Sequence, residues 1–169
     1  MKKTLAAFLV LMIAALANGF QDSLEWVKHT SEAGRYSALF PKQPLIGTNE
    51  ATAKTGEKFT QYTAQSTDSD SVYSVAYADN IPGRVYSLDD ARNDILNAAK
   101  GTVLKEEAIS LGGSPGKEIK ISAKSGEFDL LLRARYYTIG GRLYLLQHVF
   151  PKSLDIPAMT SSAVSDSGE

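Results

Sequence analysis

Two adjacent glycines near the end of the chain, Gly140 and Gly141, constrain the fold more than any other feature. They separate two long runs, 127–138 and 142–150, that are rich in aromatic, aliphatic and β-branched residues. A two-residue loop between such runs forms a tight hairpin, because glycine adopts the positive φ angles that this kind of turn requires. The sequence therefore predicts a long antiparallel hairpin, in which Ile139 lies opposite Arg142.

The same turn predicts which side chains share a face of the hairpin, because strand side chains alternate between the two faces. One face is expected to be core and carries three pairs: Tyr136 with Leu145, Ala134 with Gln147, and Leu132 with Val149. The other face carries three pairs of mixed character: Tyr137 with Tyr144, Arg135 with Leu146, and Arg133 with His148.

This second face supplies the candidate ligand-binding residues: Arg133, Arg135, Tyr137, Tyr144 and His148. Arginine offers two parallel donors to a carboxylate or phosphate, and tyrosine offers a flat apolar surface with a polar tip. A small anionic ligand is the expected occupant. The alternative is the wetter side of an ordinary antiparallel sheet, partly covered by the C-terminal tail.

Further strands are indicated by short runs of aromatic and β-branched residues between turn residues. The expected strands are 35–40, 45–54, 57–64, 72–78, 103–110 and 117–124. The polar run 66–71 is expected to be a turn, and Pro151 to end the last strand.

One helix is expected after Ser87, which with Asp90 resembles a capping box. Apolar residues follow at helical spacing as far as Ala99, and Gly101 is expected to provide the left-handed residue that ends the helix. The order of strands, one helix and strands predicts an α+β domain with a mainly antiparallel sheet of about six to eight strands packed against one or two helices.

The N-terminal residues 1–17 have the pattern of a signal peptide: Lys2 and Lys3, an apolar run, and Ala15-Leu16-Ala17 as a cleavage site. The apolar run from Leu5 to Leu16 is 12 residues long, whereas a membrane-spanning helix needs about 20. An uncleaved anchor is the alternative. Cleavage predicts an exported protein, periplasmic or extracellular, without a transmembrane segment, and with a single domain over 18–152 followed by a polar tail at 153–169.

Charge and cysteine content narrow the functional classes. Without the signal, 152 residues carry 16 basic and 19 acidic side chains, a net charge of −3. Nucleic-acid binding requires a basic footprint, so this class is not expected. The chain has no cysteine, so disulfides do not contribute to its stability.

Two motifs invite a binding interpretation and fail on their spacing. LGGSPGKE, from Leu111 to Glu118, resembles a phosphate loop, but it lacks the required length and hydroxyl residue and leads into a strand. Asp68-Ser69-Asp70 resembles a calcium loop, but Tyr73 stands where the loop needs a glycine. A connecting turn is expected at each place, and a looser calcium site on the two aspartates is the alternative.

Catalysis has little support in the sequence. The chain has two histidines, His29 and His148, far apart in sequence, and no serine in a nucleophile elbow. No catalytic residue, metal site or cofactor is therefore expected. His148 is expected to pack within the sheet and His29 to lie at the surface.

Four segments resemble a group of small exported bacterial domains with the PsbP-like fold: Gly34–Pro41 (GRYSALFP), Gly112–Glu118, Arg135–Tyr137 and Gly141–Tyr144. The resemblance covers roughly Trp26 to Phe150 and implies an antiparallel sheet packed against helices. That fold also occurs in a lumenal photosystem subunit and in a Ran-binding import cofactor. Members of the group commonly end in a helix with an aromatic close, whereas the tail here has no aromatic residue and is expected to be a weak helix or disordered.

These observations predict a non-catalytic, exported binding or accessory module of the cell envelope, whose partner is a small anionic ligand or another envelope protein. Two alternatives belong to other classes. One is a small envelope hydrolase that uses Arg133, Arg135 and His148; the other is a purely structural envelope component.

Overall fold

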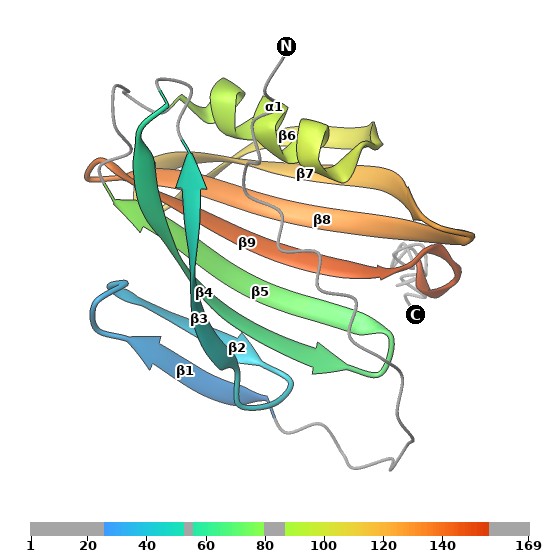
Figure 1. Cartoon of the computed structure of the whole chain (residues 1–169), viewed down its shortest axis with the longest axis horizontal. Coiled ribbons are helices and arrows are strands. Elements are labelled where there is room, and N and C mark those ends of the chain that lie inside the picture. The colour runs from blue at the N-terminus through green and yellow to red at the C-terminus, as the bar shows by residue number, and fades with distance from the viewer. Residues whose placement is uncertain (1–25, 53–55, 80–86, 156–169) are drawn as a thin grey trace, which may run out of the picture.

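The computed structural model describes residues 26–52, 56–79 and 87–155. Within these ranges, seven strands form one antiparallel sheet in the order β3-β4-β5-β9-β8-β7-β6, and β1 and β2 form a separate antiparallel pair (Figure 1). The elements are β1 (Val27–Ser31), β2 (Tyr36–Phe40), β3 (Leu45–Thr52), β4 (Lys58–Asp68), β5 (Ser71–Asp79), α1 (Leu88–Ala99), β6 (Thr102–Leu111), β7 (Ser114–Ser125), β8 (Phe128–Ile139), β9 (Arg142–Pro151) and a 3₁₀ turn, η1 (Lys152–Leu154). The expected α+β class is confirmed.

The β8–β9 hairpin has the predicted turn and register. Gly140 and Gly141 have φ angles of 58° and 80°, and Ile139 pairs with Arg142. All six predicted cross-strand pairs are present, from Tyr137–Tyr144 to Leu132–Val149. The two glycines therefore determine which side chains of this hairpin face the core.

The helix α1 covers one side of the sheet, called here the helix face, where it packs on β7 and β8 (Figure 1). Its buried residues Ala91 and Ile95 join a core that includes Ile119, Tyr136 and Leu145. This core contains both members of the predicted pair Tyr136–Leu145 and at least one member of the other two pairs, so the helix covers the face that the sequence assigned to the core.

Both ends of α1 have identifiable caps. The backbone N–H of Asp90 donates to the Ser87 hydroxyl at 3.1 Å, as expected. At the other end, Lys100 and not Gly101 is the left-handed residue, with φ 48°. Gly101 is required for a different reason: a Cβ there would lie 2.5 Å from Ile121 Cγ2 and from the Ser122 carbonyl oxygen.

The pair β1–β2 packs on the other side of the sheet, called here the hairpin face. Phe40 of β2 is buried there with Ala64 and Val75, and Leu146 packs against this cluster. The sequence did not predict β1, because VKHTS contains a single aliphatic residue and does not alternate clearly. His29, expected at the surface, is half-buried beside Phe40, with ring centroids 6.1 Å apart.

Two predicted turns are shorter than expected. Strands β4 and β5 extend through most of the polar run 66–71 and leave Ser69 and Asp70 as the turn, with Ser69 at φ 47°. Similarly, Gly112-Gly113 alone connects β6 to β7, so Pro115 and Gly116 belong to the strand. In both places cross-strand hydrogen bonds outweigh the local turn preference of polar residues, proline and glycine.

Three predictions involve residues outside the described ranges: the signal peptide at 1–17, the end of the strand predicted at 45–54, and the tail after Asp155. Within the ranges that are described, no helix is both long and apolar enough to cross a membrane.

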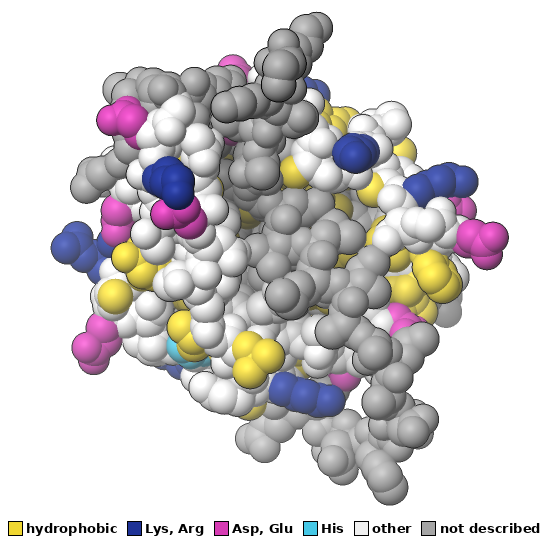
Figure 2. Space-filling view, in the orientation of Figure 1, with side chains coloured by type: hydrophobic (Ala, Val, Ile, Leu, Met, Phe, Trp, Pro, Cys, Tyr) yellow, Lys and Arg dark blue, Asp and Glu magenta, His cyan; other side chains and the backbone are white. Residues whose placement is uncertain are grey.

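In the view of Figure 2, basic and acidic side chains are interspersed around the molecule.

Candidate functional site

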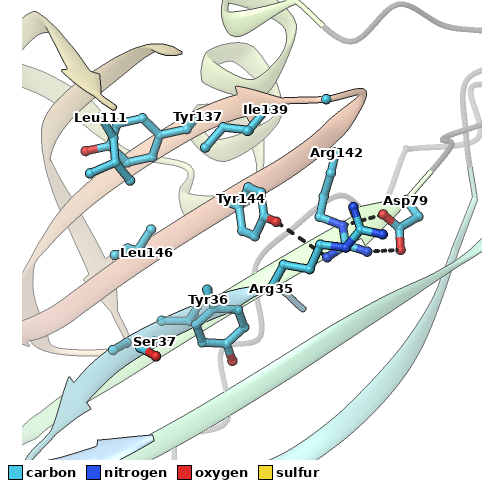
Figure 3. Close-up of a pocket in the computed structure, with 13 residues that line it drawn as sticks. Arg35, Tyr36, Ser37, Asp79, Leu111, Tyr137, Ile139, Arg142, Tyr144 and Leu146 are labelled. Carbon is cyan, nitrogen blue, oxygen red and sulfur yellow. Dashed lines mark hydrogen bonds and ion pairs between the residues drawn. The ribbon is translucent and has the colours of Figure 1, made fainter. Parts of the chain in front are cut away.

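A pocket of about 650 Å³ lies on the hairpin face, between the β1–β2 pair and the end of the sheet where β8 turns into β9 (Figure 3). Its volume is typical of small-molecule sites. One wall comes from β2 and the residue before it, through Arg35, Tyr36, Ser37 and Ala38. The sheet and its turns supply the remainder: Val75, Asp79, Leu111, Tyr137, Ile139, Gly140, Arg142, Tyr144 and Leu146.

A row of tyrosines crosses the sheet beneath this pocket. Tyr137, Tyr144, Tyr77 and Tyr62 occupy matching positions on four neighbouring strands, β8, β9, β5 and β4. The rings of Tyr62 and Tyr77 stack, with their centroids 4.8 Å apart. Tyr36 of β2 contacts the Tyr77 ring in an edge-on arrangement, with ring centroids 6.2 Å apart. Of these tyrosines, Tyr36, Tyr137 and Tyr144 line the pocket, so that three aromatic side chains contribute to its walls.

Gly116 on β7 leaves room for the ring of Tyr137, the last tyrosine of the row. It lies opposite Tyr137, and a Cβ at this position would come within 2.4 Å of Tyr137 Cδ1. The Tyr137 ring therefore lies directly over the glycine. This close approach is the structural role of the glycine in SPGKE, which the sequence assigned to a turn.

Arg142 joins the sheet to the β1–β2 pair. Its Nη2 donates to Asp79 Oδ2 at 2.7 Å and its Nη1 donates to the Ala33 carbonyl oxygen at 2.9 Å. The guanidinium also lies 4.6 Å from the Tyr77 ring centroid. The hydrogen bonds that Arg142 donates to Asp79 raise the pKa of Arg142, and its guanidinium is occupied by partners within the chain. The Tyr144 hydroxyl adds a second link by donating to the Gly34 carbonyl oxygen at 2.9 Å.

Arg35 is the other cation at the pocket. It is exposed, with a left-handed φ of 51°, and its side chain extends toward the end of the pocket that holds Arg142 and Asp79 (Figure 3). Among the described residues, no acceptor is hydrogen-bonded to its guanidinium. Because Asp79 balances Arg142, Arg35 leaves the pocket with one uncompensated positive charge.

The structure separates the five residues predicted from the hairpin into two groups. Tyr137 and Tyr144 line the pocket, whereas Arg133, Arg135 and His148 do not. Arg135 forms an ion pair with Glu118 on β7, and the Arg133 Nη2 lies 3.2 Å from Asp155 Oδ1, just after η1. Both arginines therefore already hold a carboxylate of the same chain.

His148 packs within the sheet, as the sequence predicted, and its neighbours there are aromatic rings. Its ring stacks on those of Tyr73 and Phe150, with centroid distances of 4.3 Å and 4.4 Å. Burial, with a smaller contribution from Arg133, lowers the pKa of His148. Its Nε2 is buried without a hydrogen-bond partner, and the lowered pKa favours the neutral ring.

Sequence reasoning did not select four of the polar pocket residues: Arg35, Tyr36, Asp79 and Arg142. The signal for Arg142 was available, because the predicted register already placed it on the same face as Tyr144. Arg35 could not be found in this way, since its position depends on how the β1–β2 pair docks on the sheet.

The two motifs that were interpreted as turns each contain a shorter turn. Gly112 and Gly113 connect β6 to β7 without a helix that could hold phosphate. Asp68 ends β4 and Asp70 lies in the following turn. Within the described part of the chain, no three acidic, histidine or cysteine side chains are grouped as a metal site would need.

Comparison with solved structures shows the same architecture elsewhere. The structure resembles the cyanobacterial PsbP protein CyanoP from Synechocystis sp. PCC 6803, with a TM-score of 0.50 and 14% sequence identity over 81% of this chain and 86% of that one. The chain has the PsbP-like fold. A Pseudomonas aeruginosa protein of unknown function is also similar, with a TM-score of 0.44 and 11% identity over 76% of this chain and 84% of that one. Neither a protein-family model nor a curated protein sequence matches the chain.

Proposed function

We propose that this PsbP-like domain is a non-catalytic, exported binding module, and that its ligand is a small organic anion held in the pocket between the β1–β2 pair and the sheet. The observation that carries the proposal is the combination of the aromatic pocket with the guanidinium of Arg35, which is paired with no acceptor in the described part of the chain. Specific ligand sites commonly join apolar walls to a few polar groups that fix orientation.

The composition of the pocket supports a ligand with one acidic group and a flat apolar body. A single uncompensated guanidinium fits one carboxylate, which it can bind through two parallel hydrogen bonds. Tyr36 and Tyr137 offer ring faces and edges to a planar group, and Leu146 and Ile139 add aliphatic surface. The proposal assigns the anion to Arg35 and not to Arg133 or Arg135, because those two already pair with Asp155 and Glu118.

Export is supported by the signal pattern at residues 1–17. Expression of the full chain in a bacterial host tests it directly. Mass spectrometry of the periplasmic fraction or medium should find a chain that begins at Asn18, and retention of the intact chain in the cytosol would contradict it.

Thermal-shift titration tests the binding function. Phenylacetate and its 4-hydroxy derivative should raise the melting temperature in a saturable manner, whereas the matched neutral amides should not, because only the acids offer a partner to Arg35. Equal shifts for acid and amide, or no shift with any aryl carboxylate, would contradict the proposal.

The same preparation distinguishes the hydrolase alternative. An enzyme that used Arg133, Arg135 and His148 would convert a nitrophenyl ester with multiple turnovers and would lose this activity in His148→Ala. The binding module should give no turnover that depends on His148, whose Nε2 is buried.

A further inference from the structure

The two edges of the large sheet differ in how they are protected against pairing with another strand. Edge strands expose unpaired N–H and C=O groups, and proteins commonly blunt them with charges, bulges or a covering element. Here β3 forms one edge and β6 forms the other (Figure 1).

The β6 edge carries the expected protection. Its register shifts at a bulge between Val103 and Lys105, and it presents the charged run Lys105-Glu106-Glu107. Glu106 is further held by Arg92 of α1 at 2.6 Å and by Lys117 at 3.0 Å. A second strand would meet an irregular, charged backbone at this edge.

The β3 edge has no bulge among its described residues and carries little charge. Its sequence, LIGTNEAT, has one charged residue, Glu50, and its eight residues pair with β4 without a shift in register. Its first two side chains, Leu45 and Ile46, are 82% and 65% exposed on opposite faces of the sheet. A regularly paired, nearly uncharged edge with exposed aliphatic side chains is a template for strand addition.

We propose that β3 pairs with β3 of a second copy of this chain, so that two sheets join into one continuous antiparallel sheet. The pairing is isologous, with a two-fold axis perpendicular to the sheet that places one residue opposite its own copy. When Thr48 is that residue, the paired segment 45–51 lies wholly within β3.

This register is favourable at the positions that carry the hydroxyl, aliphatic and charged side chains of the strand. Thr48 faces Thr48 of the second copy, and two threonines in such a pair can form a hydrogen bond across the strands. Leu45 faces Ala51, and Ile46 faces the methylene stem of Glu50, so that both exposed aliphatic side chains are covered. The only charge of the strand faces an aliphatic residue and not its own copy, which avoids repulsion between like charges. This self-complementarity is the reason for choosing a second copy over an unrelated peptide.

Sedimentation velocity tests the interface with matched substitutions at the two edges. The wild-type chain should sediment as a dimer at about 100 µM, a concentration that populates micromolar complexes. Ile46→Lys should weaken self-association at least ten-fold, whereas Leu104→Lys, at a similarly exposed position on β6, should leave it unchanged. A monomeric wild type, or an equal effect of the two substitutions, would overturn the proposal.

Because the chain has no cysteine, single cysteines test the register independently. Opposed Cα atoms in an antiparallel pair lie about 4.5–5.5 Å apart, within the range that a disulfide spans. Thr48→Cys should therefore crosslink to its own copy under mild oxidation. Glu50→Cys should not, because its two copies would be about four residues apart along the strands, roughly 13 Å. Crosslinking of Glu50→Cys and not Thr48→Cys would contradict this register.

Discussion

His148 shows how one buried side chain can make stability depend on pH. Its ring is stacked between Tyr73 and Phe150, and burial lowers its pKa in the folded protein below the ordinary value of 6.5. The unfolded chain therefore binds a proton at a higher pH than the folded chain does. The contribution of His148 to stability is complete above about pH 6.5 and decreases as the pH falls toward its folded pKa.

The replacement His148→Phe keeps the aromatic stack and removes the titratable group. Between pH 6.5 and pH 5, the free energy of unfolding of the wild type should fall more steeply than that of the variant, as measured by urea denaturation at each pH. The shifted carboxylates, Glu106 and Asp155, have lowered pKa values and titrate below this window. Parallel pH profiles for the two proteins would show that His148 does not carry this dependence.

Gly116 illustrates a glycine that is required by close packing. Its replacement by alanine would place Cβ 2.4 Å from Tyr137 Cδ1 and 2.7 Å from the Tyr136 carbonyl oxygen. Gly116→Ala should therefore lower the free energy of unfolding by about 1–3 kcal/mol, as overpacked sites do. Gly47→Ala is the matched control, since its Cβ would meet only Thr63 Oγ1 at 3.3 Å. Equal urea midpoints for the two variants would contradict the assigned role of Gly116.

At the scale of single elements, α1 depends on its N-cap. Ser87 accepts from the Asp90 backbone N–H at 3.1 Å and donates its hydroxyl to Asp90 Oδ2 at 2.8 Å. Ser87→Ala should cost about 1 kcal/mol of stability. Ser110→Ala, at an exposed strand position, should change it by less than about 0.5 kcal/mol. Calorimetry that found both variants equally stable would exclude capping as the role of Ser87.

Elements with a local cause could be predicted from the sequence. The register of β8 and β9 follows from two glycines, and the start of α1 follows from a serine followed by helical spacing. The strand β1 was missed because its segment has a single aliphatic residue and no clear alternation, and it becomes a strand through its pairing with β2. The turns were predicted too long because cross-strand pairing in the sheet overrides local turn preference.

At the scale of the whole molecule, the sequence predicted two of the residues that line the pocket, and it did so for a physical reason. Register placed Tyr137 and Tyr144 on one face, and both line the pocket. Arg133 and Arg135 share that face, but their carboxylate partners come from β7 and from the segment after η1. No local pattern reveals which distant carboxylate an arginine will meet. Arg35 enters the site only because the β1–β2 pair folds over the sheet.

The central claim is that Arg35 gives this aromatic pocket its selectivity for an organic anion. Isothermal titration of 4-hydroxyphenylacetate tests it most directly, with Arg35→Gln compared with Arg133→Gln as the matched substitution. The account predicts saturable 1:1 binding to the wild type and to Arg133→Gln. It also predicts an affinity about ten-fold to one-hundred-fold weaker for Arg35→Gln, the loss expected for a charged hydrogen bond. Binding that survives Arg35→Gln and is lost in Arg133→Gln would contradict it.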